Sequence, residues 1–191
     1  MLKMSTDQVR HALNGPTMGT RWSALFFAHP DFDPEPVRAA LQDAVDEVDA
    51  QMSTWKPGSD LMRLNAAPAG ALITIPARLM DVLRLGLEIG RASGGAFDIG
   101  MGDAVTAWGF GPEAAALGGI RAAMAAERVP AFEALEIDAA ASRVRKIAPL
   151  ALDLNGVAKG YGVDRMADIL REAGIAANLV GIDGEMRATG L

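Results

Sequence analysis

Apolar residues recur at intervals of three and four in two long segments of the chain, the spacing that places them on one face of an α-helix. Asp33 precedes Pro34 at the start of the first segment, an order typical of an N-cap followed by proline at the first helical position. The second segment begins at Pro76 and ends before Ser93-Gly94-Gly95. The pattern predicts helices over residues 33–52 and 76–92. The apolar positions are Val37, Leu41, Val45, Val48 and Met52 in the first segment and Leu79, Leu83 and Leu87 in the second.

Shorter β-forming runs lie between and after these helices, separated by turn-forming residues. Residues 9–27 predict two short strands around a turn at Gly15-Pro16, and Asp183-Gly184 predicts a hairpin. These elements together predict a single α+β domain over 1–191, with mixed or antiparallel sheets and packed helices. The other expected elements are strands over 73–75, 133–138, 143–148, 177–182 and 186–189, a short helical turn capped by Ser59 or Asp60, an Ala-rich helix within 112–129, and a helix over 157–173 that ends at Gly174.

The composition excludes several kinds of chemistry. A net charge of −6 argues against a nucleic-acid partner, which would favour a basic face. The chain has no cysteine, so disulfides, thiolate metal sites and cysteine nucleophiles are excluded. His11 and His29 are the only histidines, and both precede the first long helix. We therefore expect no Ser-His-Asp triad and no histidine metal site, and we expect both residues at the surface or at strand ends.

The N-terminal residues 1–8 lack the apolar run of a signal peptide or membrane anchor. The chain as written is therefore expected to be cytoplasmic, although its sequence leaves the compartment unknown.

The segment from Ala151 to Asp164 combines acidic residues, glycines and a lysine in what reads as a strand-to-helix turn. Asp153 and Asn155 are expected at the strand end, the helix near Gly156, and Lys159 in its first turn. A lysine there is disfavoured by the helix dipole, so its position indicates an anion at the same end of the helix. A solvated lysine on a glycine-tolerant helix is the alternative.

Three other segments carry more information than a core needs: 16–20, 51–65, and 94–100 followed by 107–111. Met18 is expected beside the turn of the first of these, and a strand corner with Met18 in the core is the alternative. Trp55 lies on a Pro/Gly loop, where its ring could stack on a flat ligand or cover the end of the first helix. Asp98 could accept a hydrogen bond from a ligand or serve as a turn residue. Two separate Gly-rich segments, 94–100 and 151–164, favour a nucleotide site built from distant parts of the chain.

In this order the segments resemble the ApbE family, the FAD:protein FMN transferases. The resemblance covers about residues 15–190. It rests on Met18-Gly19-Thr20, Met52-Ser53-Thr54-Trp55 with Leu64-Asn65, Gly95-Ala96-Phe97-Asp98 with Trp108-Gly109-Phe110-Gly111, Asp153 through Asp164, and Leu179 through Gly190. In the last of these, Asp183 stands where the family usually has a glycine.

The resemblance implies an ApbE-like, T-fold-related domain and a Mg²⁺-dependent enzyme. Such an enzyme transfers FMN from FAD to a Ser or Thr hydroxyl of an acceptor flavoprotein and releases AMP. Members of the family are often exported or anchored in a membrane. The resemblance also implies that Ala158 offers its backbone carbonyl to Mg²⁺. The residues implied to contact FAD are Met18, Trp55, Ala96, Phe97, Asp98, Asn155 and Tyr161, with Lys159 as a charge near the phosphates.

Compared with the family, the chain is expected to hold the N-terminal FAD-binding portion and to lack the C-terminal portion with the side-chain Mg²⁺ ligands. No catalytic residue can therefore be named. A transferase with impaired activity is one hypothesis, and a non-catalytic FAD-binding protein or remnant is the alternative. A dimer or a complementing C-terminal chain is expected to cover the last strand.

Overall fold

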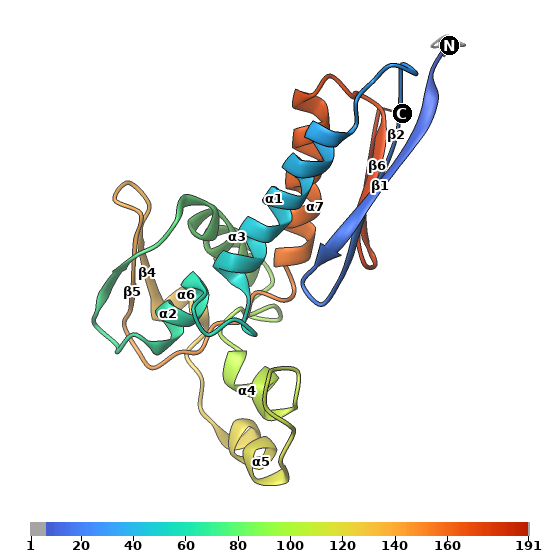
Figure 1. Ribbon diagram of the computed structural model, residues 1–191. Coiled ribbons are helices and arrows are strands. Elements are labelled where there is room, and N and C mark those ends of the chain that lie inside the picture. The colour runs from blue at the N-terminus through green and yellow to red at the C-terminus, as the bar shows by residue number, and fades with distance from the viewer. Residues whose placement is uncertain (1–6, 191) are drawn as a thin grey trace. The chain divides into compact units, whose positions relative to one another are not determined.

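The computed structural model describes residues 7–190, and Figure 1 shows its helices and strands. The chain divides into two compact units. The four-stranded unit comprises Met1–Asp49 and Lys159–Leu191, and the three-stranded unit comprises Ala50–Ala158. The expectation that residues 1–191 act as a single domain stays a prediction, and most of the N-terminal stretch 1–8 lies outside the described residues.

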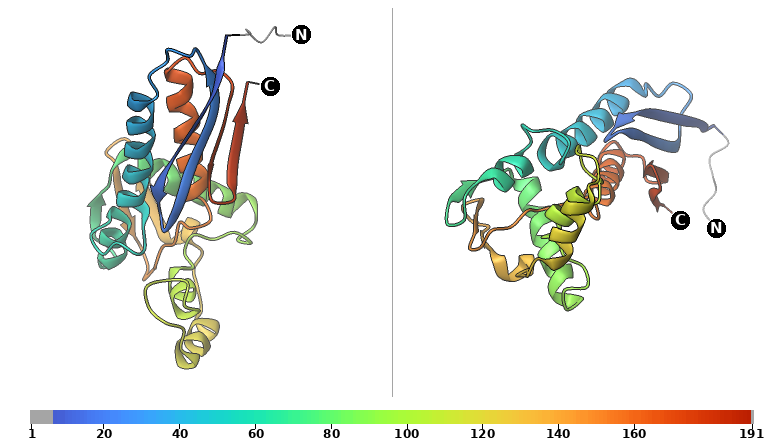
Figure 2. Two further views of the ribbon diagram at one scale, coloured as in Figure 1. Left: turned by 45° about the vertical axis from the view of Figure 1, so that its right-hand side comes forward. Right: turned by 90° about the horizontal axis from the view of Figure 1, so that it is seen from below.

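The four-stranded unit is built on an antiparallel sheet in the order β1-β2-β6-β7. One face of this sheet is covered by α1 and α7 (Figures 1 and 2). The strands are β1 Val9–Thr17, β2 Thr20–Ala28, β6 Asn178–Ile182 and β7 Glu185–Thr189, and the helices are α1 Glu35–Met52 and α7 Ala158–Glu172. The predicted helices over 33–52 and 157–173 and the hairpin at Asp183-Gly184 are thus confirmed.

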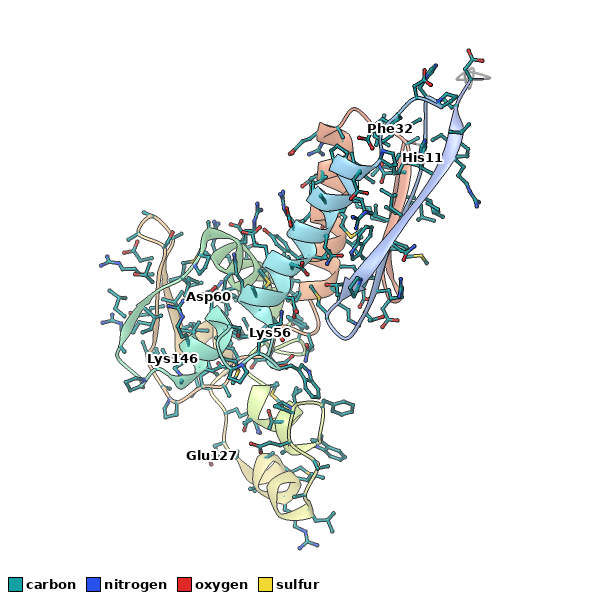
Figure 3. The ribbon with its side chains drawn as sticks, viewed as in Figure 1. His11, Phe32, Lys56, Asp60, Glu127 and Lys146 are labelled. Atoms are coloured by element: carbon teal, nitrogen blue, oxygen red, sulfur yellow. The ribbon has the colours of Figure 1, made fainter. Side chains whose placement is uncertain are left out.

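The core of this unit follows from alternation along β2. Successive side chains of a strand point to opposite faces, so every second residue meets the helices. Trp22 and Phe26 are almost completely buried against the apolar stripes of both helices. His11 lies within β1, and its ring stacks on Phe26 at a centroid distance of 5.2 Å, with Phe32 beside it (Figure 3). The expectation of a surface or strand-end role is therefore wrong for His11.

The predicted break at Gly15-Pro16 is also wrong. Both residues lie inside β1, which pairs with β2 as far as Thr17 and Thr20. Pro16 is tolerated because β1 is an edge strand, where a missing N–H costs no ladder bond. Gly15 is needed for packing, because a Cβ there would lie 2.5 Å from Trp22 Nε1.

The reversal instead occurs at Met18 and Gly19, with φ of 45° and 73°. Positive φ at both central residues is the geometry that two-residue hairpins favour, because its twist matches that of the flanking strands.

The three-stranded unit combines a small antiparallel sheet, in the order β3-β5-β4, with short helices. Its strands are β3 Leu72–Thr74, β4 Leu135–Asp138 and β5 Arg143–Lys146, and its helices are α2 Asp60–Ala66, α3 Ala77–Ala92, α4 Gly102–Ala107, α5 Leu117–Ala125 and α6 Ala131–Ala134. The predicted helix over 76–92, the predicted hairpin over 133–148 and the N-cap at Ser59 are confirmed.

The Ala-rich segment is only partly helical. The predicted helix over 112–129 is reduced to α5, and α4 was not expected from the sequence. In α5, Gly118 and Gly119 occupy the first turn, where the N–H groups have no intrahelical partner and glycine costs less than in a helix interior. The two helices contact each other, so α4 is stabilised by packing that its own sequence does not reveal.

Candidate functional site

The two Gly-rich segments lie side by side in the three-stranded unit. Gly102 N–H donates to Ala151 O at 3.0 Å, and Asp153 N–H donates to Ile99 O at 2.9 Å. Gly102 permits this approach, because a Cβ there would lie 2.9 Å from two backbone oxygens of the facing segment. The structure thus joins residues 99–102 and 151–153, as expected of a site built from distant parts. The predicted strand before the turn is wrong, however, because Ala151 makes only an isolated parallel bridge with Met101.

Asp153 forms a closed turn with Asn155. Its Oδ1 accepts from Asn155 N–H and its Oδ2 accepts from Asn155 Nδ2, both at 2.9 Å. Burial raises the pKa of the Asp153 carboxyl, and the bond from the Asn155 backbone partly offsets that rise. Asn155 itself is exposed, as is Gly156 after it. The turn therefore presents exposed backbone immediately before α7.

Asp98 is engaged by the protein backbone. Its Oδ1 accepts from Gly100 N–H at 2.7 Å and from Ala131 N–H at 3.1 Å, the latter at the start of α6. These bonds fit the alternative interpretation of Asp98 as a turn residue, and its contact with FAD stays a prediction. The neighbouring Phe97 is half-buried, and a Cβ on Gly156 would lie 3.1 Å from its ring. Ala96 is exposed.

Trp55 lies on the loop between α1 and α2 with 59% of its surface exposed. Its backbone N–H donates to Ser53 Oγ at 3.1 Å. Ser59 Oγ donates to Ser53 O at 2.7 Å and accepts from Met62 N–H, which makes Ser59 the N-cap of α2. The loop backbone is therefore tied at both ends while the indole faces solvent, as a stacking surface requires.

Asn65 and Lys146 were not selected as site residues from the sequence. The Asn65 side chain bonds both peptide groups of Leu152: Nδ2 donates to Leu152 O at 2.9 Å, and Oδ1 accepts from Leu152 N–H at 2.8 Å. Lys146 is 4% exposed, and its Nζ donates to Asn65 O at 2.7 Å (Figure 3). Burial lowers the pKa of Lys146. The sequence held one signal for each residue: Asn65 is part of the Leu64-Asn65 motif, and Lys146 occupies an inward-facing position of a predicted strand.

Met18 lies at the tip of the hairpin in the four-stranded unit, half-buried and with left-handed backbone. Strain of this kind at a non-glycine residue is often associated with function. Gln42 holds the strand just before the tip, since its Nε2 donates to Pro16 O at 3.0 Å while its Oε1 accepts from Trp22 Nε1 at 2.8 Å.

Lys159 pairs with an internal carboxylate. It lies in the first turn of α7, and its Nζ is 3.0 Å from Asp183 Oδ2. The anion expected beside Lys159 is thus, in this structure, a side chain of the protein. Asp183 has a φ of 56°, the left-handed conformation that a glycine would adopt more easily. Tyr161 is half-buried in the same helix, and Ala158 is buried at its first position.

The predicted site residues are divided between the units: Met18, Lys159 and Tyr161 belong to the four-stranded unit, and the others to the three-stranded unit. Within residues 7–190, no group of three or more histidine, aspartate or glutamate side chains is arranged to hold a metal ion. In the same range, no helix is long and apolar enough to cross a membrane.

Comparison with known proteins gives concordant matches. The chain is 32% identical to the FAD:protein FMN transferase of Vibrio cholerae and 29% identical to that of Escherichia coli, each match covering 94% of this chain. It covers 54% and 52% of those two proteins, so it spans about half the length of the curated relatives it matches.

Solved structures agree with this. The flavin transferase ApbE from Vibrio cholerae superimposes with a TM-score of 0.86 at 31% identity, over 96% of this chain and 60% of that one. The apo flavinyl transferase ApbE from Pseudomonas stutzeri gives 0.85 at 32% identity, over 98% of this chain and 60% of that one.

The model of the ApbE family matches residues 18–191, a range that includes every predicted site residue. The hairpin tip at Met18, the paired Gly-rich segments and the turn before α7 all lie within that match, and the chain belongs to the ApbE family.

Proposed function

We propose that this chain carries the FAD-binding portion of an FAD:protein FMN transferase. The enzyme would move FMN from FAD to a Ser or Thr hydroxyl of an acceptor flavoprotein: a bond forms between that oxygen and the FMN phosphorus, and the bond to AMP breaks. The relatives from Vibrio cholerae and Escherichia coli are FAD:protein FMN transferases, which supports this reaction. The observation that carries the proposal is the pairing of residues 99–102 with 151–153, which brings two of the family's signature segments together.

In the three-stranded unit, the residues present fit a flavin nucleotide. The exposed Trp55 ring offers a face for stacking, and its loop is already held by Ser53 and Ser59. The exposed backbone at Asn155 and Gly156 lies close to the Phe97 ring. A rigid aromatic face beside exposed peptide groups suits a ligand with a flat ring and a phosphate. The roles of Ala96 and Asp98 in binding FAD remain part of the proposal.

In the four-stranded unit, Lys159 would supply positive charge for the phosphates. To do so it would exchange Asp183 for the ligand, since the two side chains are 3.0 Å apart in this structure. Met18 and Tyr161 would add contacts to FAD. The side chain of Met18 already approaches α7, because its Cε lies 3.8 Å from the point where a Cβ on Gly162 would be.

Mg²⁺ would neutralise charge on the pyrophosphate during transfer. In the proposal, Ala158 provides one backbone carbonyl ligand. Mg²⁺ requires six oxygen ligands in near-octahedral geometry. The described residues contain no cluster of carboxylate or histidine side chains that would complete such a set. Residues 7–190 alone therefore do not fit a complete Mg²⁺ site, and the remaining ligands would have to come from other groups.

This lack of a metal cluster favours a second candidate function: FAD binding without transfer. The strand β7 bears on both candidates, because its residues are largely exposed and Met186 is 69% exposed. Exposed edge strands in proteins are usually covered, so a second copy or a complementing chain would bind there.

The two candidates are separated by one pair of measurements. The chain is titrated with FAD, and flavin transfer to an acceptor peptide is then followed with and without Mg²⁺. Both measurements are repeated after addition of the downstream half of a relative in trans. A transferase portion should bind FAD and gain Mg²⁺-dependent transfer when complemented, whereas a binder should bind FAD without turnover. A chain that does not bind FAD would contradict both.

Trp55→Ala tests the proposed contact of Trp55 with FAD. We expect FAD affinity to fall by about 1–3 kcal/mol if the indole stacks on a ring of the ligand, by analogy with base–aromatic stacking. Because Trp55 is 59% exposed, thermal stability should hardly change. Phe27→Ala is the matched control, an exposed aromatic of the four-stranded unit that should leave FAD affinity unaltered. Equal affinities of Trp55→Ala and wild type would remove Trp55 from the site.

A further inference from the structure

The short helix α2 connects two candidate binding segments of the three-stranded unit. At its N-terminal end, Ser59 bonds Ser53 O and caps the helix, and Ser53 Oγ accepts from Trp55 N–H. At its C-terminal end, Asn65 bonds Leu152, the residue before Asp153. The helix is therefore tied by side-chain hydrogen bonds to the loop of Trp55 and to the turn of Asp153.

The Asn65 side chain supplies the backbone hydrogen bonds that a neighbouring strand would otherwise give to Leu152. Leu152 lies in a segment without regular secondary structure, and its side chain and backbone are buried. A buried peptide group without a partner is costly, so the N–H and the C=O of Leu152, which belong to two successive peptide groups, both require hydrogen bonds. The Asn65 amide supplies both at once, at 2.8 and 2.9 Å, and this two-point contact fixes the orientation of the peptide as well as its position.

Lys146 holds the same contact from the other side. From its buried position on β5, its ammonium donates to Asn65 O at 2.7 Å and to Leu150 O at 3.3 Å (Figure 3). It therefore links the end of α2 to the segment that enters the Asp153 turn. Hydrogen bonds from a charged donor are stronger than neutral ones, so the two carbonyls offset part of the cost of burying this charge, although burial still lowers the pKa of Lys146.

Beyond Leu152 the chain is held against the other Gly-rich segment by the bond from Asp153 N–H to Ile99 O. The contacts thus run without interruption from β5, through the end of α2, to the turn that presents Asn155. A change at Asn65 or Lys146 would move that turn without removing any group proposed to touch FAD.

We propose that Asn65 and Lys146 are positioning residues that hold the Asp153–Asn155 turn in the conformation that binds FAD. The inference rests on the proposed function, because it assigns to these two residues the placement of its binding turn. It adds a half-buried asparagine and a buried lysine that the sequence motif alone does not assign.

The test compares Asn65→Ala with wild type in two measurements on the whole chain. Amide hydrogen exchange of Leu152 and Asp153 is followed by NMR, and FAD affinity is measured by titration below the melting temperature of every variant. We expect faster exchange at both amides and an FAD affinity lower by about tenfold or more, as the loss of a buried two-point contact implies. Asn65→Asp keeps the side-chain volume but cannot donate to Leu152 O at neutral pH. If this variant also shows faster exchange and lower FAD affinity, the effect is not due to a cavity.

Asn178→Ala is the matched control. Asn178 is a buried asparagine that, like Asn65, donates to a backbone carbonyl, Ile175 O at 3.2 Å, but it lies on β6 of the four-stranded unit. The Asn178→Ala variant should be less stable than wild type, but amide exchange at Leu152 should not change. Its FAD affinity should stay within about twofold of wild type. Lys146→Met should act in the same direction as Asn65→Ala. The double variant should lose less affinity than the sum of the two single losses, because both residues act on one segment.

The outcomes are distinguishable. Unchanged exchange at Leu152 and Asp153 in Asn65→Ala, or faster exchange with unchanged FAD affinity, would overturn the inference and leave the proposed function intact. A similar loss of affinity in Asn178→Ala would also overturn it, because the effect would then follow general stability. A wild-type chain that does not bind FAD would overturn the proposed function and this inference together.

Discussion

The four-stranded unit holds its candidate residues by regular secondary structure, whereas the three-stranded unit holds them by hydrogen bonds between polar side chains and the backbone. In the former, Met18 lies at the tip of a two-residue hairpin, and the sheet packs through Trp22 and Phe26 against two helices. In the latter, Asp98 and the Asp153 turn lie outside the strands and are held by side-chain bonds to backbone.

This difference between the two units indicates which interactions hold the candidate residues of each: apolar packing in the four-stranded unit and hydrogen bonds in the three-stranded unit. The burial of apolar surface has no preferred direction. A packed sheet therefore tolerates substitutions that keep the side-chain volume of the core and the alternation of apolar and polar positions. Hydrogen bonds to buried peptide groups are directional, and the loss of one partner leaves the other unsatisfied. The hairpin tip should therefore depend on the core as a whole, and the Asp153 turn on a few polar side chains.

The largest expected effect is on the core of the four-stranded unit. Trp22→Ala should lower the free energy of unfolding by about 3–5 kcal/mol, because it removes a completely buried aromatic side chain and leaves a cavity. The measurement is urea denaturation followed by circular dichroism. Phe27→Ala, on the exposed face of the same strand, should change stability by about 0.5 kcal/mol or less. Equal losses in the two variants would show that this unit does not depend on its helix-facing core.

A smaller effect is expected for a polar support of the three-stranded unit. Asp98→Ala removes the acceptor of two backbone N–H groups, those of Gly100 and Ala131, and should cost about 1–3 kcal/mol in the free energy of unfolding. Asp103→Ala is the control, because its exposed ion pair with Arg128 should contribute about 1 kcal/mol or less. If Asp98→Ala has no effect on denaturation, the contrast between the two units loses its main support.

The smallest effect concerns pH. The pKa of Asp153 is raised above its ordinary value of 3.8 in the folded protein, because burial disfavours the carboxylate. Between the ordinary and the raised pKa the folded state binds more protons than the unfolded state, so this group lowers stability as pH rises through that window. In Asp153→Asn that contribution is absent. The free energy of unfolding of wild type minus that of the variant should therefore decrease as pH rises through the same window.

Denaturation of both proteins at a series of pH values measures this difference and cancels the contributions of other carboxyls. Those contributions have the opposite sign where an arginine lowers the pKa, as at Glu35 and Asp138. A difference that is flat or increases with pH would contradict the burial of Asp153.

The sequence predicted most elements, and the errors have physical causes. Gly15-Pro16 was interpreted as a turn because both residues disrupt strands, yet in the structure glycine makes room for Trp22 and proline lies on an edge. Both causes appear only once β1 is paired with β2 and placed at the edge of the folded sheet. The true turn at Met18-Gly19 contains only one of the usual turn residues, and α4 owes its stability to contact with α5.

In the candidate site, too, some features could be predicted from the sequence and others depend on tertiary contacts. Trp55, the Gly-rich segments and Lys159 were predicted as site residues from residue type and spacing, and they lie within the family match. The pairing of Lys159 with Asp183, the engagement of Asp98 and the role of Lys146 could not be found in this way. Each requires the position of a partner at least 24 residues away in the sequence.

The sequence by itself determined the amphipathic helices, the terminal hairpin and the family, because periodicity and local motifs are properties of neighbouring residues. Only the tertiary structure decided which polar side chains hold the binding turn. A hydrogen bond forms only when donor and acceptor lie about 3 Å apart. Asn65 and Leu152, 87 residues apart in the sequence, reach 2.8 and 2.9 Å only once the unit is folded.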